Sequence, residues 1–241
     1  MNSIVVNLMQ VRERIELAAL EAKREPEDIE LLAVSKTFPT SAIEEAMHAG
    51  QSAFGENYVQ EAVEKIIKLE KLRPWLVWHF IGPLQSNKTR EVAEHFDWVH
   101  SVDRLKIAER LSTQRGEFPD LAPLQVCVQI NVSEEESKSG VSQTEVEVLC
   151  NAITSLPNLV LRGLMAIPAP STDSVEQRQA FAAVQDCFQQ IKAAHANDLG
   201  YQFFDTLSMG MSDDLEAAII EGSTMVRVGS AIFGKRDKIS K

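Results

Sequence analysis

The chain alternates between short apolar runs and stretches with helical periodicity along its whole length. We expect each apolar run to form a buried strand and each periodic stretch to form an amphipathic helix. The apolar runs lie at residues 30–35, 52–55, 76–81, 98–101, 124–132, 160–166, 206–208 and 225–230. The helical stretches lie at residues 41–49, 57–71, 86–95, 103–114, 142–154, 174–197 and 213–221. Eight strands with helices between them predict a closed parallel (β/α)8 TIM barrel, and an open doubly wound sheet is the alternative because it alternates in the same way.

The length and continuity of the chain favour a single domain, residues 1–241. The 241 residues lie in the range of about 200–250 residues that is common for one α/β barrel. No Gly/Ser-rich linker, low-complexity tract or sequence repeat interrupts them. One extra helix is expected before the first strand, because apolar residues there are spaced by three or four positions. These residues are Leu8, Val11, Ile15, Ala18 and Ala22.

Three of the expected helices carry a start signal. In a capping box, a serine at the helix start is followed three residues later by Glu or Gln, and each side chain bonds the backbone N–H of the other. The pairs with this spacing are Ser41 with Glu44, Ser142 with Glu145 and Ser174 with Gln177. We therefore expect these three helices to begin at the serines.

Charge and cysteine content exclude several classes of function. The formal net charge of −11 argues against binding to bare nucleic acid, which attracts basic surfaces. Cys127, Cys150 and Cys187 are widely spaced, so we expect reduced thiols and no metal site. The N-terminal segment MNSIVVNLMQVRERIE has a short apolar run that charges follow at once, which does not fit a signal peptide or a membrane span. We expect a cytoplasmic protein without membrane contact.

Lys36 is the first candidate functional residue, because functional groups in such barrels follow the carboxyl ends of the strands. It directly follows the first apolar run and shares a strand face with Leu32 and Val34. If these two residues point inward, Lys36 lies at the mouth of the barrel. A partly desolvated lysine has a lowered pKa, and its neutral amine forms an imine with an aldehyde. The alternative is a lysine whose stem is buried while its ammonium reaches water.

Polar residues also follow the second, third and fifth apolar runs. Asn57 can exchange a hydrogen bond with a polar ring substituent, or it merely belongs to the start of the next helix. His79 lies either at the barrel mouth or among hydrogen-bonded core residues. The polar segment 133–140 is expected on the functional face, as a flap or as a solvated turn.

Small residues follow the seventh and eighth runs, the two places where such barrels tend to bind phosphate. Backbone N–H groups in loops of this kind form an anion cradle with little need for side-chain charge. Arg227 and Gly229 share an inward strand face. A buried arginine there needs an acceptor, such as a ring nitrogen, a phosphate or a carboxylate. The residues expected at the ligand from these loops are Ser208, Met209, Gly210, Arg227, Gly229 and Ser230.

The two ends of this predicted site define one type of ligand. A lysine after the first strand calls for an aldehyde, and a cradle after the last two strands calls for a phosphate. Pyridoxal 5′-phosphate (PLP) carries both groups, so we expect it as a Schiff base on Lys36. A barrel that binds another phosphorylated metabolite is the alternative, and it would keep its ligand in the Lys36→Ala variant.

Six stretches resemble the pyridoxal phosphate homeostasis protein family, in order and over nearly the whole chain. They are LAVSK (32–36), FGENY (54–58), HFIGPLQSNK (79–88), GLMA (163–166), LSMGMSDD (207–214) and RVGSAIFG (227–234). The resemblance implies a single-domain, alanine racemase-like barrel of PLP fold type III. It also implies that Lys36 carries the cofactor and that Arg227 faces the pyridine nitrogen. The phosphate-binding positions that it implies are Ser208, Gly229 and Ser230.

The resemblance further implies a regulator of vitamin B6 and amino-acid metabolism without an established enzymatic activity. A racemase of this class takes a second base, a tyrosine, from a separate β domain, and we expect no such domain here. The only tyrosines are Tyr58 and Tyr201. We therefore expect a monomeric carrier that exchanges PLP with apo-enzymes. A PLP-dependent racemase or decarboxylase, with Lys36 as its base, is the alternative.

Overall fold

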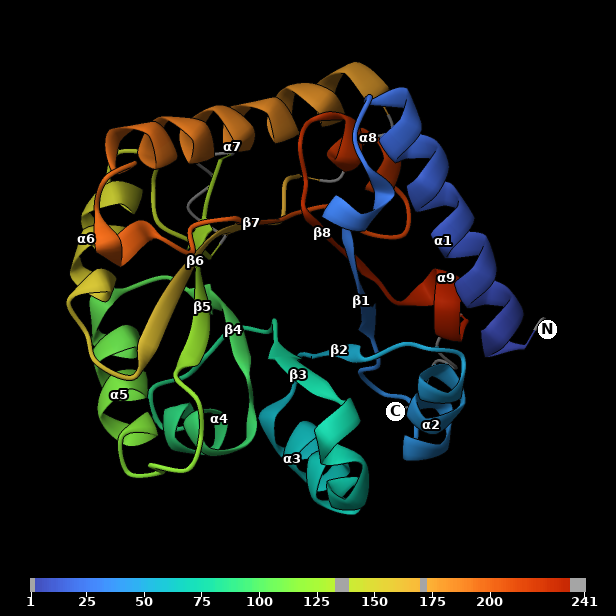
Figure 1. Ribbon diagram of the computed structural model, residues 1–241, viewed down its shortest axis with the longest axis horizontal. Coiled ribbons are helices and arrows are strands. Elements are labelled where there is room, and N and C mark those ends of the chain that lie inside the picture. Colours follow the sequence, from blue (N-terminus) through green and yellow to red (C-terminus); the bar gives the residue numbers. More distant parts are fainter. Residues whose placement is uncertain (1–2, 133–138, 170–172, 235–241) are drawn as a thin grey trace.

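Eight parallel strands form a closed barrel in the computed structural model, which describes residues 3–132, 139–169 and 173–234. The strands pair in chain order, and β1 pairs with β8 to close the ring (Figure 1). This closure confirms the predicted barrel and excludes the open doubly wound sheet. The strands are β1 (Glu30–Val34), β2 (Ala53–Glu56), β3 (Val77–Phe80), β4 (Trp98–Val102), β5 (Leu124–Ile130), β6 (Leu159–Ala166), β7 (Thr206–Ser208) and β8 (Met225–Val228).

Helices surround the ring of strands and cover its outer face (Figure 1). The helices are α1 (Ile4–Glu21), α2 (Thr40–His48), α3 (Val59–Lys68), α4 (Thr89–His95), α5 (Leu105–Arg115), α6 (Val146–Thr154), α7 (Ser174–Ala194), α8 (Leu215–Ile220) and α9 (Ser230–Phe233). Short 3-10 turns lie at Pro26–Asp28, Glu70–Trp75 and Leu199–Tyr201. Helix α1 precedes β1, as the sequence predicts. Within the described ranges, no helix is long and apolar enough to cross a membrane.

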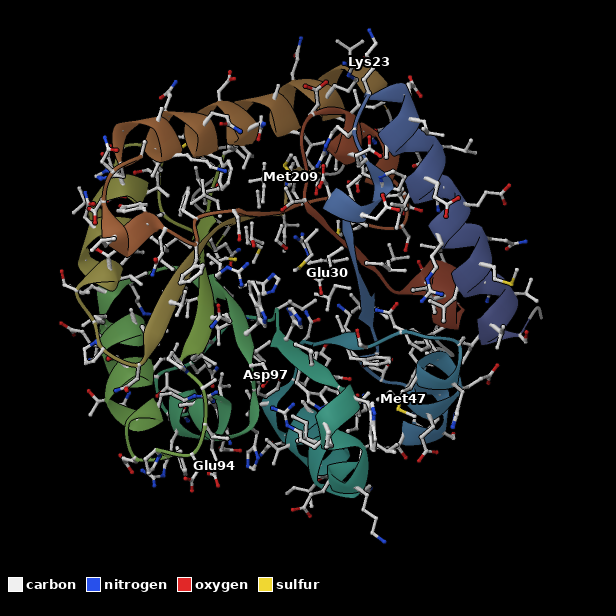
Figure 2. The ribbon with its side chains drawn as sticks, viewed as in Figure 1. Lys23, Glu30, Met47, Glu94, Asp97 and Met209 are labelled. Carbon is white, nitrogen blue, oxygen red and sulfur yellow. The ribbon has the colours of Figure 1, made fainter. Side chains whose placement is uncertain are left out.

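Alternate residues of β1 enter two different layers. Ala33 is buried in the outer layer, between the strands and the helices. Leu32 and Val34 are buried inside the ring, as expected for the strand that leads to Lys36. Glu30 has the same parity and lies within the ring of strands in Figure 2. The inner cluster around these residues consists of Leu32, Val34, Ala53, Ile81 and Met225.

Of the three helices expected to begin at a serine, α7 does so at Ser174, whereas α2 and α6 do not, and in none of the three is the predicted serine the N-cap residue. Helix α2 begins one residue before Ser41, with Pro39 at its N-cap position, and no side chain caps it. Ser142 does bond to Glu145, with 2.6 Å between Oγ and Oε2, but this pair forms a turn that precedes α6. Asp173 is the N-cap residue of α7, and its carboxylate accepts a hydrogen bond from the first turn. An aspartate or a turn immediately upstream therefore takes the role that the sequence pattern assigns to serine.

Helix α1 joins the beginning of the chain to its last elements (Figure 1). It packs against α8 and α9 through an apolar face that includes the predicted residues up to Ala18. Arg14 donates to the backbone carbonyl of Ser212 at 2.9 Å and pairs with Glu216 at 2.6 Å. Asn7 donates from Nδ2 to the carbonyl of Ile232 at 2.8 Å. These contacts fix the segments that follow β7 and β8, which form one side of the barrel mouth.

Candidate functional site

A cavity of about 250 Å³ opens at the carboxyl ends of the strands. Segments after β1, β2, β3, β6, β7 and β8 form its walls, so residues far apart in the sequence meet there. Five of the residues predicted at the cofactor line the cavity together: Lys36, Asn57, Arg227, Gly229 and Ser230. The other lining residues are Val34, Phe38, Ile81, Ile167, Met211, Ser212, Asp213 and Gly234.

Lys36 lies two residues beyond the end of β1, in a turn, and its side chain is half-buried. Thr37, the next residue, has a φ of 68°. This left-handed conformation is unusual for a β-branched residue and costs about 1–3 kcal/mol, so it persists only where surrounding contacts enforce it. Here Glu61 provides such a contact, because its Oε1 accepts the N–H of Thr37 at 2.5 Å. The backbone around Lys36 is therefore set by tertiary contacts.

Asn57 lines the cavity from the end of β2, and its side-chain amide oxygen lacks a partner among the described residues. Oδ1 is buried without a hydrogen bond to any described residue. Gly82 packs so closely that a Cβ there would lie 2.1 Å from the backbone oxygen of Asn57. Since the backbone is held and the buried acceptor is unsatisfied, Asn57 Oδ1 is suited to accept a hydrogen bond from a ligand.

Arg227 places a buried cation beside the cavity. One terminal nitrogen donates to the Ser208 carbonyl at 2.6 Å and to its hydroxyl at 2.9 Å, and the other donates to the Ala166 carbonyl at 2.9 Å. Burial lowers the pKa of Arg227 to about 10, so the guanidinium stays charged at neutral pH. No carboxylate of the described residues lies within ion-pair distance of it. Backbone carbonyls, which the sequence argument did not consider, thus serve as acceptors for Arg227. They leave its positive charge unneutralised, so an anionic or electron-rich ligand can still pair with it.

The other three predicted residues lie outside the lining of the cavity. Ser208 is fully buried, and its hydroxyl lies between Arg227 and His100, at 2.9 Å from each partner atom. Met209 is buried in the outer layer beside β7 (Figure 2). Gly210 has a φ of 92°, and a Cβ there would come within 2.5 Å of helix α8. Ser208, the last residue of β7, therefore contacts the site only through Arg227, which does line the cavity.

A pair of buried histidines extends this hydrogen-bond chain into the barrel. His100 Nδ1 lies 2.9 Å from Ser208 Oγ, and His100 Nε2 lies 2.9 Å from His79 Nδ1. The His79 ring stacks on Trp98. Burial lowers the pKa of His79 to about 3 and also lowers that of His100, so both rings are neutral at neutral pH. His79 is thus a hydrogen-bonded interior residue, whereas sequence reasoning overlooked His100, whose two-residue spacing from Trp98 marks it as inward-facing.

The segment after β7 supplies cavity residues that the sequence argument did not single out. Ser212 lines the cavity, and its hydroxyl accepts the N–H of Ala231 at 3.4 Å. Met211 donates its N–H to Asp214 Oδ1 at 2.5 Å. The stretch LSMGMSDD contained Ser212, but strand parity says nothing about a residue in a loop. Of the polar segment predicted as a flap or turn, residues 133–138 lie outside the described residues.

Comparison with protein families and curated proteins gives consistent results. Residues 6–237 match the model of the alanine racemase N-terminal domain. The chain is 55% identical to the pyridoxal phosphate homeostasis protein of Escherichia coli K12, over the full length of both. It is also 55% identical to the protein of that name from Haemophilus influenzae, over 96% of this chain and 95% of that one.

Solved structures agree with these matches. PipY of Synechococcus elongatus, in a structure with PLP bound, is 38% identical, with a TM-score of 0.78 over 93% of this chain and all of that one. Alanine racemase from Corynebacterium glutamicum has a TM-score of 0.62 at 15% identity, with 96% of this chain matching 62% of that enzyme. This second likeness concerns the fold alone and supports the predicted alanine racemase-like barrel.

Proposed function

Because the chain belongs to the alanine racemase N-terminal domain family, and within it to the pyridoxal phosphate homeostasis proteins, we propose that it binds PLP at the barrel mouth and holds it as a Schiff base on Lys36. The observation that carries this proposal is the convergence of five predicted residues on one cavity. The bound PLP in PipY supports the identity of the ligand.

The residues of the cavity fit the cofactor at both of its ends. Lys36 supplies the amine, and the backbone amides and hydroxyl at Gly229 and Ser230 would hold the phosphate at the start of α9. Strand β8 ends at Val228, two residues earlier than the sequence predicts, and Ser230 is the first residue of α9. The unsatisfied Oδ1 of Asn57 would accept a hydrogen bond from a ring substituent. When bound, PLP supplies an electrophilic aldehyde and an electron-withdrawing ring.

Arg227 would set the electronic character of the bound ring. Its guanidinium is cationic and held by backbone carbonyls, so it can only donate a hydrogen bond. A donor at the pyridine nitrogen keeps that nitrogen unprotonated and so weakens the ring as an electron sink. This property favours reversible storage of PLP over carbanion chemistry.

The proposed role is a carrier that exchanges PLP with apo-enzymes that require it. Neither tyrosine lines the cavity: Tyr58 is 53% exposed, and Tyr201 is buried and bonded to Asn151 at 2.7 Å. A tyrosine base for racemisation is therefore not supplied by the described lining residues. We further propose that the protein acts as a monomer in the cytoplasm, where its free cysteines, Cys127 and Cys150 among them, would stay reduced.

Borohydride reduction followed by peptide mapping tests the covalent link. The wild-type protein is expected to be yellow after incubation with PLP and to carry the reduced tag on Lys36. The Lys36→Ala protein is expected to be colourless, whereas Lys68→Ala, which removes an exposed lysine from α3, should remain yellow. A tag on any other residue in place of Lys36 would refute the assignment.

Exchange of α-deuterium distinguishes the carrier from a PLP-dependent racemase or decarboxylase. The carrier is expected to leave the α-deuterium of free amino acids in place on the time scale of cofactor transfer. Rapid loss of the label that disappears in Lys36→Ala would overturn the carrier role while leaving the cofactor site intact.

A further inference from the structure

A buried ionic cluster lies directly behind the turn that carries Lys36. Lys65, on α3, is only 6% exposed. Its ammonium donates to the Ser35 carbonyl at 2.9 Å, to Glu56 Oε1 at 2.8 Å and to Glu61 Oε1 at 2.6 Å. An ammonium has three N–H groups, so these partners account for all of them. Lys65 thus joins two carboxylates and the backbone carbonyl of the residue that follows β1 to one position on α3.

The same cluster holds both peptide groups of Lys36. The Ser35 carbonyl belongs to the peptide bond before Lys36, and Lys65 binds it. The Thr37 N–H belongs to the peptide bond after Lys36, and Glu61 binds it at 2.5 Å. Since Lys65 and Glu61 also pair with each other, the two residues of one ion pair form hydrogen bonds to the backbone on both sides of the Lys36 Cα. The direction in which the Lys36 side chain leaves the backbone is therefore fixed.

Glu56 anchors this ion pair to the barrel. It is the last residue of β2 and is fully buried. Its Oε1 accepts from Lys65 and from the Ser35 hydroxyl, at 2.8 Å and 2.7 Å. Its Oε2 is buried without a partner among the described residues. The cluster connects α3, β2 and the end of β1 on the side of the sheet away from the cavity.

Stability alone does not account for this arrangement. Buried ion pairs give little net stabilisation, because desolvation of both charges offsets their attraction. The left-handed Thr37 adds a conformational cost. Three features that are unfavourable or neutral for folding thus coincide at the two peptide bonds of one residue. They are the buried Lys65, the incompletely paired Glu56 and the strained Thr37.

We propose that Glu61 and Lys65 are positioning residues that aim the Lys36 amine into the cavity. This inference rests on the proposed function, in which that amine forms the bond to PLP. Neither residue lines the cavity, so they act through the Ser35–Thr37 backbone. Their removal should weaken covalent capture and leave recognition of the phosphate and the ring unchanged.

Two ligands separate these contributions. PLP forms the covalent bond to Lys36. Pyridoxine 5′-phosphate carries an alcohol in place of the aldehyde, so it can bind only noncovalently. Glu61→Ala is expected to lower the affinity for PLP about tenfold or more, because small displacements of a reacting group have large effects. Its affinity for pyridoxine 5′-phosphate should stay within about twofold of wild type, because this ligand forms no bond to Lys36 and Glu61 does not line the cavity. The side chain of Glu61 is 31% exposed, so this variant should fold.

Matched variants complete the experiment. Glu61→Gln keeps an oxygen that can accept the Thr37 N–H and should recover most of the PLP affinity. Glu64→Ala removes an exposed carboxylate from the same helix and should behave as wild type. Lys65→Met should lower PLP affinity further. If this variant does not fold, because Glu56 is left buried and unpaired, the Glu61 pair of variants decides the question.

The outcomes distinguish this inference from the proposed function. Equal losses for both ligands in Glu61→Ala, or no loss for PLP, would overturn the positioning role. Absence of a reducible bond to Lys36 in the wild-type protein would instead refute the proposed function itself.

Discussion

Acid is expected to destabilise the barrel through the buried pair of histidines. Burial lowers the pKa of His79 from 6.5 to about 3, so the ring stays neutral in the fold. The unfolded chain binds this proton below pH 6.5. Stability is therefore complete above pH 6.5 and is lost as the pH falls toward 3. In that interval His79 alone removes about 1.4 kcal/mol per pH unit, or about 2 kcal/mol between pH 8 and pH 5.

Urea denaturation at several pH values between 8 and 5 measures this effect. His79→Asn places an amide near the position of Nδ1, which lies 2.9 Å from His100, and it cannot titrate in this range. The variant should be less stable at pH 8, since it loses the stacking on Trp98. Its free energy of unfolding should nevertheless fall by about 2 kcal/mol less than that of wild type between pH 8 and pH 5.

The test depends on how steeply the free energy of unfolding changes with pH, and its absolute value at one pH does not decide the question. His48→Asn serves as the control, because His48 is exposed and its substitution should leave the wild-type slope unchanged. Parallel curves for wild type and His79→Asn would refute the reasoning. They would mean that the folded protein protonates His79 as readily as the unfolded chain, through water entry or rearrangement of the His100 contact.

Three further predictions follow from backbone geometry, charge and burial. Gly163→Ala should cost about 3 kcal/mol in urea denaturation, because φ is 151° and a Cβ would lie 1.8 Å from the Thr206 carbonyl; an unchanged midpoint would show that the strands shift freely. Arg227→Lys should weaken PLP binding about tenfold in a spectrophotometric titration, since one ammonium cannot replace the guanidinium fork; equal affinity would remove Arg227 from the site. Cys127 and Cys150, whose thiol pKa values burial raises, should resist thiol reagents at pH 8 until urea unfolds the chain; their labelling in the native state would contradict their burial.

Strand parity predicted which face a residue occupies, but it could not predict the depth of that residue in the barrel. Alternation placed Leu32, Val34 and Lys36 on one face, and the structure agrees for the two apolar residues. Ser208 was predicted at the phosphate, yet it lies outside the lining of the cavity, and its pairing with Met225 fixes its height in the barrel. That register depends on how neighbouring strands are staggered, which no single strand encodes.

Irregularities in the sheet also limit prediction from a repeating pattern. The pairing of β5 with β6 shifts between Val126 and Cys127. Beyond this shift Met165 lies inside the ring, whereas its neighbour Leu164 is buried in the outer layer. A bulge reverses the parity of every residue that follows it, and its position results from packing between strands. Apolar composition alone gives no sign of it.

The polar clusters were the least accessible to sequence reasoning. Lys65 occupies a helix whose charged residues would be read as solvated, and it is buried because β1 and β2 supply its partners. His100 gains its role from His79 and Ser208, which belong to other strands. Such groups are recognised by their partners, and partners distant in sequence meet only after the fold is known.

The contact between α1 and the last elements has a consequence for the order of synthesis. Asn7 and Ile232, which bond to each other, are separated by 225 positions. At about 5–20 residues per second, the ribosome needs about 10–45 s to add that many residues. During this time the apolar face of α1 and the open edge of β1 lack the partners that α9 and β8 later provide. The nascent chain is therefore most exposed to aggregation before its final segment appears, and the cofactor cavity is the last part of the molecule to form.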